Sequence, residues 1–419
     1  MNILLDPYFN DVCKEKIHSI QPTVSTNSKH SYLYFANIQN KVKSSKGVSN
    51  SKLNNPIEKI KGRLIDEKNQ AIPYCNIVIK GSIIGTISNR NGFFEIKFSK
   101  NLKVDTLIFS CVGYERREVA VSDLLETTML ISKEVILDEI KIEAKSLDPV
   151  SILKKAIDNI PQNYIQQDYN AEIYSRGILT NYDSLVVDVE NVVKIYDKNG
   201  FDNNENITRN SIAFRKNKFY RCISSSPKAV AYSPFFLQKV DMVSISPLFK
   251  KKNLKKYCFK LLGTTEYNDE KVYKIGFNSK STAYRYTLAY YIKKFSGTIY
   301  VNSIDYSIVK TAVCWEYNLD KIKGINDFYP EVEYIKSSAA YKKHNSKYFF
   351  NYGNYTRILE GKNSRTKNDY KLKGEQTIFT TKIELKDVEI IPEKQSISLK
   401  SKKLKKDDAF WDNYNKPVK

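Results

Sequence analysis

The sequence predicts a mostly-β protein with a small N-terminal β-sandwich, a joining helix, and a large twisted antiparallel sheet or half-barrel. Apolar and polar residues alternate in short runs through most of the chain, and clusters of turn-forming residues separate the runs. One stretch instead repeats its apolar residues at helical spacing. At 419 residues the chain is too long for one small sandwich, so at least one further domain is expected.

The sandwich is expected over residues 57–142, where short strand-like runs follow one another closely. The segment from Asn89 to Gly92 gives the sharpest local signal, because Asn and Gly accept the positive φ that a tight hairpin turn requires. We therefore predict a hairpin whose second strand begins at Phe93. Further turn clusters lie at residues 66–70, 81–82 and 99–103.

The order of short motifs in this stretch is specific. It reads G-R-L-I-D, then A-I-P-Y-C-N-I-V-I-K-G, G-T-I-S-N-R-N-G-F-F-E-I and L-I-F-S-C-V-G-Y-E. This order resembles the carboxypeptidase-regulatory-like domain, which is abundant in cell-envelope proteins of Bacteroidetes-type bacteria. The resemblance implies a seven-stranded-type sandwich, immunoglobulin-like or transthyretin-like, with an accessory and non-catalytic role. The positions that match its turn and core residues are Gly62, Pro73, Gly92, Phe94, Gly113 and Tyr114.

A joining helix is predicted over residues 148–161. Asp148 can cap its start, Pro149 suits the first helical position, and Pro161 is expected to end it. The apolar residues of this segment recur every three to four positions, so one side of the helix should pack on the second domain. They are Val150, Leu153, Ile157 and Ile160.

Residues 165–395 return to alternation with a period of two and predict one large antiparallel sheet, curled into a half-barrel. Short hairpins are expected at residues 267–270 and 302–305. Residues 215–253 contain three prolines and predict a helical or irregular insertion that lies over one face of the sheet.

The two ends of the chain have a different character. Residues 1–56 are rich in Ser, Asn and Lys and predict a flexible segment. Residues 396–419 predict a basic tail, whose run at residues 400–408 is expected to be solvated, although the aromatic residues Phe410 and Trp411 that follow are unusual in a disordered end. The same envelope proteins end in a similar F-W-x-x-Y-N motif, so the resemblance extends to this end.

The net charge of +22 raises the question of an anionic partner. Most of the basic residues are lysines scattered along the chain, which favours a solvated basic surface over nucleic-acid recognition. Acidic glycan, lipid headgroups and nucleic acid remain alternatives. The densest basic run, Lys250 to Lys256, could touch anionic headgroups, but solvation is the simpler interpretation.

Six cysteines are spread along the chain without a Cys-x-x-Cys pair, so neither a zinc ribbon nor a dense disulfide framework is predicted. Cys75 and Cys111 both fall in predicted sandwich strands and could meet across the core. Two buried free thiols are favoured over a disulfide between them.

We predict no catalytic, cofactor-binding or metal-binding residues. A zinc peptidase needs a His-x-x-Glu pair and a further His, whereas none of His18, His30 and His344 has Glu three residues later. The phosphate-binding motifs and the serine nucleophile elbow are missing from the sequence. Adjacent carboxylate pairs read as solvated charge at turns or strand ends; they are Asp138-Glu139, Asp269-Glu270 and Asp407-Asp408.

An aromatic cluster in the second domain has two interpretations. Its residues could stack on sugars or line an apolar groove, but filling the core of the half-barrel is favoured. The cluster contains Tyr284, Tyr286, Tyr290, Tyr291 and Phe295.

The envelope setting predicts an export signal, which the printed N-terminus does not provide. The apolar run Ile3-Leu4-Leu5 is short and leads directly into Asp6 and Pro7. A misassigned start, a removed signal and a cytoplasmic protein are the three explanations. No run of eighteen apolar residues predicts a membrane-spanning helix.

Taken with the resemblance, these features predict a non-enzymatic protein that binds or scaffolds other components at the outer membrane or in the periplasm. Envelope proteins, glycans and lipids are the candidate partners. One alternative is an accessory component of TonB-dependent nutrient uptake, because the same sandwich often precedes the plug of those receptors. The other alternative is a basic, cytoplasmic nucleic-acid-binding protein.

Overall fold

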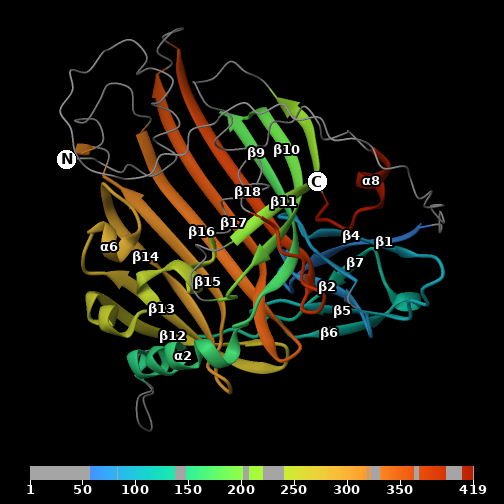
Figure 1. Ribbon diagram of the computed structural model, residues 1–419, viewed down its shortest axis with the longest axis horizontal. Helices are drawn as coiled ribbons and strands as arrows, with labels where there is room; N and C mark the ends of the chain where they lie inside the picture. The colour runs from blue at the N-terminus through green and yellow to red at the C-terminus, as the bar shows by residue number, and fades with distance from the viewer. Residues whose placement is uncertain are drawn as a thin grey trace.

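The computed structural model describes residues 57–82, 84–136, 148–201, 207–219, 240–318, 320–321, 331–362, 368–392 and 408–418. Within these ranges a small sandwich packs against a large curved sheet (Figure 1). This arrangement confirms the predicted mostly-β fold class. The segment 1–56, predicted to be flexible, lies outside the described residues.

The sandwich consists of a three-stranded and a four-stranded sheet, which matches the expected seven-stranded type. Large apolar side chains from both sheets fill the space between them; Leu64, Ile77, Phe94 and Phe109 are at most 1% exposed. The first sheet has the order β4 (Phe93–Ser99), β1 (Ile57–Ile65) and β7 (Thr127–Met129), and the second has β3 (Gly85–Ile87), β2 (Asn76–Ile79), β5 (Thr106–Ser110) and β6 (Arg117–Ala120).

The predicted hairpin at Asn89 to Gly92 is wrong in its topology, although the turn itself is tight. Asn89 Oδ1 accepts the backbone N–H groups of Asn91 and Phe93 at 2.9 Å, and Gly92 has a φ of +80°. The flanking strands, however, pair with different neighbours: β3 pairs with β2, and β4 pairs with β1. The turn therefore carries the chain from one sheet of the sandwich to the other.

Cys75 and Cys111 are free thiols in the core of the sandwich. Asn76 of β2 pairs with Ser110 of β5, and Cys75 and Cys111 each lie one residue beyond this pair. The two cysteines therefore face each other at the end of the paired strands. Burial, together with the neighbouring Cys111, raises the pKa of the Cys75 thiol well above its ordinary value. The thiol therefore stays protonated and packs as a small apolar side chain.

The second body is an open, eleven-stranded antiparallel sheet. The hairpin turns predicted at residues 267–270 and 302–305 connect neighbouring strands of this sheet, as expected. In spatial order the strands are β11 (Ile207–Phe219), β10 (Ser184–Asp197), β9 (Tyr169–Asn181), β18 (Asp369–Glu384), β17 (Lys347–Lys362), β16 (Glu331–His344), β15 (Ile308–Tyr317), β14 (Ile292–Asn302), β13 (Glu270–Ser279), β12 (Tyr257–Tyr267) and β8 (Val135–Ile136).

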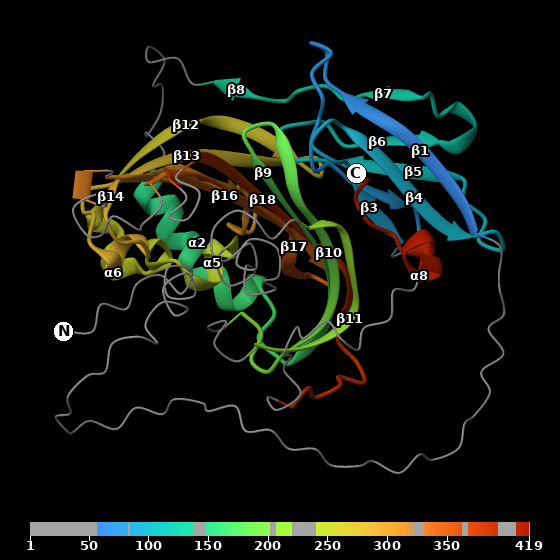
Figure 2. The same ribbon diagram turned by 90° about the horizontal axis from the view of Figure 1, so that it is seen from above.

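The sheet curves so that its two faces have different partners (Figure 2). The concave face packs on the helices α2 (Pro149–Asn163) and α5 (Met242–Ile245), whose apolar residues join the largest core cluster. The convex face packs on the sandwich. Alternation along β9 separates the two cores, because Ile173 belongs to the concave core and Tyr174 to the convex one.

Helix α2 begins as predicted but does not end at Pro161. The Asp148 carboxylate accepts the N–H groups of Val150 and Ser151, and Pro149 follows the cap. The helix continues to Asn163 because its last turn is held from outside: Asn159 and Asn163 donate to the carbonyl of Asp305 at 3.1 and 2.8 Å. Tertiary contacts here outweigh the cost of a proline in the last turn.

Two further boundaries differ from the prediction. Strand β8 lies within the stretch assigned to the sandwich, yet it pairs with β12 and so belongs to the large sheet. Residues 215–219, assigned to the insertion, extend β11 instead. The described remainder of the insertion, from residue 240, is helical: α5 is followed by the 3-10 turns Pro247–Phe249 and Lys251–Lys256.

We predict that Asp197→Asn flattens the pH dependence of stability in the acidic range. Asp197 is 3% exposed, and burial raises its pKa to about 6. The folded state therefore favours the protonated acid. Below about pH 4 the carboxyl is protonated and its burial carries no charge penalty. As the pH rises through 6 it ionises, and the free energy of unfolding falls by up to about 3 kcal/mol. The variant should be more stable than the wild type at pH 7 and similar to it at pH 4. Urea unfolding at both pH values measures this, and an equal difference at both would contradict it.

Candidate functional site

The sandwich meets the convex face of the sheet in a region that we call the junction. Tyr74, between β1 and β2, stacks on Tyr352 of β17 with ring centroids 5.4 Å apart. The side chain of Asn351, which is fully buried, donates to Asn76 Oδ1 at 2.7 Å. The rings and amides thus give the sandwich a fixed position on the sheet.

The chain returns to this junction at its end. Residues 408–418, which we call the C-terminal segment, contain the short helix α8 (Asp408–Asn413) and lie beside both bodies (Figures 1 and 2). Trp411 is 2% exposed, and Phe410 stacks on Tyr414 at 5.0 Å. The basic tail predicted over residues 396–419 therefore ends in a docked segment, and the run expected to be solvated lies almost entirely outside the described residues. The indole belongs to a buried apolar cluster that also contains Ile87 of the sandwich and Tyr174, Val192, Ala340, Tyr352 and Phe379 of the sheet.

Asn415 fixes the C-terminal segment to the sandwich. Its amide nitrogen donates to the carbonyl of Lys97 at 2.6 Å, and its Oδ1 accepts the Lys97 N–H at 2.7 Å. Lys97 belongs to β4, which is an edge strand of its sheet. One side chain therefore satisfies both backbone groups of an edge residue, as a neighbouring strand would do.

The next residues fix the segment to the large sheet. The Lys416 ammonium pairs with Glu190, which is fully buried and also accepts the Tyr174 hydroxyl at 2.8 Å. The Tyr414 hydroxyl donates to Glu172 at 2.7 Å. Because Glu190 is fully buried, removing only Lys416 would leave a buried carboxylate without this cation, which is strongly destabilising.

We predict that Trp411→Ala lowers the free energy of unfolding by about 3–5 kcal/mol, because it leaves a cavity between two bodies as well as losing apolar burial. Urea unfolding followed by circular dichroism measures the change. Tyr284→Ala is a matched aromatic control, since Tyr284 is 44% exposed, and it should cost less than about 1 kcal/mol. A Trp411 variant as stable as this control would show that the C-terminal segment does not hold the junction together.

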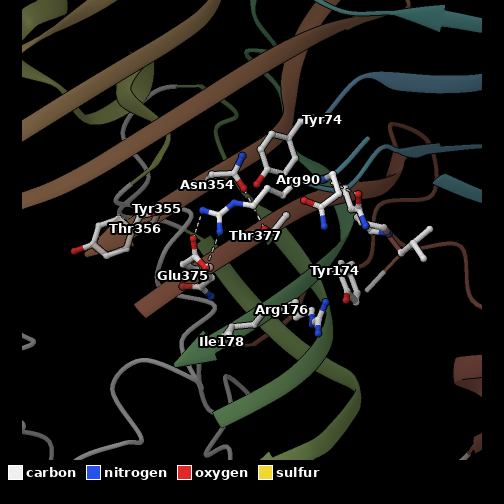
Figure 3. Close-up of a pocket in the computed structure, with 15 residues that line it drawn as sticks. Tyr74, Arg90, Tyr174, Arg176, Ile178, Asn354, Tyr355, Thr356, Glu375 and Thr377 are labelled. Atoms are coloured by element: carbon white, nitrogen blue, oxygen red, sulfur yellow. Dashed lines mark hydrogen bonds and ion pairs between the residues drawn. The ribbon is translucent and has the colours of Figure 1, made fainter. Parts of the chain in front are cut away.

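A pocket of about 170 Å³ opens at the junction, beside the end of the C-terminal segment (Figure 3). Three separate parts of the chain line it: the sandwich around Tyr74 and residues 89–91, the strands β9, β17 and β18, and the terminal residues Pro417 and Val418. Many of the lining residues carry amide, hydroxyl or guanidinium groups, but carbon atoms make up more than half of the exposed lining.

The charged groups of the pocket are already paired with each other or with nearby partners. Arg90 of the sandwich forms a two-point ion pair with Glu375 of β18, one contact of which is 3.2 Å. Arg176 contacts Asp188 through Nε at 2.9 Å and Nη2 at 3.1 Å. Both guanidinium groups therefore have a carboxylate on their hydrogen-bonding edge, which fixes their orientation.

Among the uncharged polar groups, the carboxamide of Asn354 is only half satisfied. Asn354 Oδ1 accepts the Thr377 hydroxyl at 3.1 Å, while the amide nitrogen of Asn354 is buried without a hydrogen-bond partner. Burial raises the pKa of the Tyr74 hydroxyl, against the opposing effect of Arg90, so this group remains a neutral donor.

The aromatic cluster expected in the half-barrel core divides into two parts, and none of its residues lines the pocket. Phe295 is 1% exposed and stacks on Trp315 at 5.1 Å, as a core residue should. Tyr284 and Tyr290 instead stack on each other at 4.4 Å on the surface near α6 (Tyr284–Thr287), so the core interpretation is wrong for them.

None of the remaining candidates that the structure describes lines the pocket. In the predicted basic patch, Lys251 and Lys252 are exposed, whereas Leu254 is buried. Asp269 is an exposed turn residue that pairs with Arg116 at 3.7 Å. His18, His30, the Asp138-Glu139 pair and Asp407 lie outside the described residues. Burial lowers the pKa of His344, whose ring packs against Phe349.

The described ranges lack two further features. No three His, Cys, Asp or Glu side chains there come together in the manner of metal ligands. No helix in those ranges is long and apolar enough to cross a membrane.

The protein is of a mostly-β class in which a curved antiparallel sheet carries a separate β-sandwich on its convex face. Residues 60–142 match the CarboxypepD_reg-like domain, which confirms the domain that their motifs predicted. Among curated proteins, the TonB-dependent receptor P26 of Formosa agariphila is 26% identical over 112 residues. The aligned stretch covers 27% of this chain but only 11% of the receptor.

Solved structures give weaker likenesses. A putative outer membrane lipoprotein-sorting protein domain from Vibrio parahaemolyticus has a TM-score of 0.25 at 14% identity, covering 57% of this chain and 93% of its own. The LolA superfamily protein NE2245 from Nitrosomonas europaea has a TM-score of 0.22 at 12% identity, covering 59% and 96%. TM-scores this low carry no inference about function.

Proposed function

We propose that this protein is a non-catalytic component of the bacterial cell envelope, at the outer membrane or in the periplasm, where it binds or scaffolds other components. The observation that supports this most directly is the CarboxypepD_reg-like sandwich at residues 60–142, together with the stretch similar to a TonB-dependent receptor. Both point to the same setting, although each covers a minor part of the chain.

The junction supports a scaffolding role. A scaffold must present its surfaces at a fixed relative orientation, and here stacked rings, a hydrogen-bonded amide pair and the Arg90–Glu375 ion pair join the two bodies. The C-terminal segment adds a third set of contacts that reaches both of them. Several independent sets of contacts between the sandwich and the sheet suit a protein whose two bodies must keep a fixed relative orientation.

The proposal of a non-catalytic role follows from the use of the charged side chains. At the junction, Arg90, Arg176 and Lys416 each pair with a carboxylate that belongs to another element. Catalytic carboxylates and cations need one side open to a substrate. These groups are instead used to hold the structure together.

A second candidate, an accessory role in TonB-dependent uptake, is favoured by the similarity to the Formosa agariphila receptor. In this role the sandwich would contact a receptor complex. Co-purification of a TonB-dependent receptor with the tagged protein from detergent extracts of the native host would support it, and recovery without any receptor would contradict it.

We predict that the protein is recovered in the envelope fraction of its native host. An antibody follows the protein through cell fractionation, and mass spectrometry reads its mature N-terminus. Envelope recovery with a start other than Met1 is the expected result, because export processing changes the N-terminus. A cytosolic protein that retains Met1 would contradict the proposal and make the charge of +22 the leading clue to its partner.

A further inference from the structure

We propose that one end of the large sheet binds the surface of an anionic lipid bilayer. This proposal rests on the envelope role proposed above and names a partner for it. The end in question lies where β12 begins, β13 ends and β14 begins, and it carries α6 and the 3-10 turn Lys251–Lys256 (Figure 1). We call residues 250–256 and 280–293 there the α6 end. It brings together the basic run and the aromatic cluster, which are separate in the sequence.

Hydrogen bonds hold the two segments of the α6 end together. The N–H of Lys280 donates to the carbonyl of Lys256 at 2.8 Å, and the Tyr257 hydroxyl donates to the carbonyl of Tyr286 at 2.6 Å. The Lys256 ammonium lies 5.6 Å from the centroid of the Tyr286 ring, within the range of a cation–π contact. The cations of the first segment and the rings of the second therefore form one surface.

The α6 end carries an excess of positive charge. Residues 242–265 and 271–304 contain twelve basic residues and no Asp or Glu. Carboxylates of other elements pair with some of these cations: Lys251 with Asp158, Lys274 with Glu134 and Lys294 with Glu316. The exposed cations that have no ion pair with a described residue are Lys252, Lys255, Lys280, Arg285 and Lys293. A bilayer with anionic headgroups is complementary to such a surface, because it attracts the lysines that come near it.

Two exposed tyrosines give the α6 end an apolar component. Tyr284 and Tyr290 are 44% and 36% exposed, and their rings stack at a centroid distance of 4.4 Å. Tyrosine has an apolar ring and a polar hydroxyl, so it suits the boundary between the headgroups and the acyl chains of a bilayer. The stems of the neighbouring lysines are apolar as well, so they can lie along this boundary with their ammonium groups among the headgroups.

The rings of the α6 end are less suited to nucleic acid. Single-stranded nucleic acid binds through bases that stack on aromatic rings. The ring of Tyr290 already contacts those of Tyr284 and Tyr291, with centroids 4.4 and 6.2 Å away, and the Arg285 guanidinium lies 4.9 Å from the centroid of the Tyr286 ring. Most of the exposed cations are lysines, which act as point charges and do not bind phosphates or bases in the two-point manner of arginine.

The position of the α6 end leaves the sandwich accessible. Helix α6 and the sandwich strands β1 and β4 lie on opposite sides of the molecule in both views (Figures 1 and 2). A bilayer bound at the α6 end would therefore hold the sandwich away from the lipid surface, where other envelope components can reach it. The contacts at the junction would then set the orientation of the sandwich relative to the membrane.

The test measures binding of the full chain to large unilamellar vesicles by co-sedimentation. We expect binding to vesicles of phosphatidylcholine with about one third phosphatidylglycerol, and at least about tenfold weaker binding to phosphatidylcholine alone, because anionic headgroups supply the attraction. Raising the salt concentration from about 0.1 to 1 M should release the protein, since the screening length falls from about 10 to 3 Å.

Two double variants with the same change in net charge separate the α6 end from the total charge of the protein. Lys252→Glu with Lys255→Glu should weaken binding at least about 25-fold, since each lysine near an anionic surface contributes about fivefold. Lys68→Glu with Lys100→Glu, at exposed positions of the sandwich, should weaken it less than about threefold, because these positions lie beyond the screening length. Circular dichroism confirms that the variants are folded.

A fluorescence variant reports contact of the tyrosine pair with lipid. The two native tryptophans, Trp315 and Trp411, are 7% and 2% exposed, so the emission of the wild type should not shift when vesicles are added. The emission of Tyr284→Trp should shift to the blue with the anionic vesicles, because its indole enters the interface.

No binding to the anionic vesicles, equal losses in the two double variants, or no blue shift in Tyr284→Trp would each overturn the proposal. Tighter binding of a single-stranded oligonucleotide than of the vesicles, lost in the Lys252 and Lys255 variant, would assign the α6 end to nucleic acid and overturn it as well. Envelope recovery without vesicle binding would reject this surface and keep the location, whereas vesicle binding by a cytosolic protein would do the reverse.

Discussion

The docking of Trp411 and Asn415 between the two bodies is the contact on which the rest of the arrangement depends. The indole fills an apolar space to which both the sandwich and the sheet contribute, and the carboxamide satisfies both backbone groups of Lys97 on an edge strand. An edge strand is open to pairing with any other chain, and a buried ring cannot leave its site without creating a cavity. The last residues of the chain therefore protect one edge and close the junction together.

Ion pairs at the junction also help to fix how the sandwich, the sheet and the C-terminal segment are arranged. The protein carries a large net positive charge, yet the cations at this interface are matched one by one: Arg90 with Glu375, Arg176 with Asp188, and Lys416 with Glu190. Pairs that join separate elements specify orientation more than they add stability, because the cost of desolvating each charge offsets much of the attraction.

Much of the fold could be predicted from the sequence, because period-two alternation and turn residues are local signals. The joining helix was predictable from the Asp148 cap and the apolar spacing that follows it. The predictions are wrong where contacts between residues far apart in the sequence determine the structure. Asn159 and Asn163 bind Asp305 and carry the helix past Pro161, and the turn at Asn89 joins strands of different sheets because their pairing partners lie elsewhere in the chain. The pocket had no local signal, since Tyr74, Arg176 and Asn354 come together only after folding. Phe410 and Trp411 in a basic tail were the one clue to the junction.

The most direct test of this account measures the distance between the two bodies with and without the C-terminal contacts. Spin labels at the exposed Cys258 of β12 and at a cysteine introduced at exposed Lys103 report this distance, with Cys13, Cys222 and Cys314 replaced by serine. The account predicts one narrow distance distribution in this labelled protein and a broad one in a chain that ends at residue 407. The same narrow distribution in both chains would show that the sandwich is held without the C-terminal segment and would contradict the account.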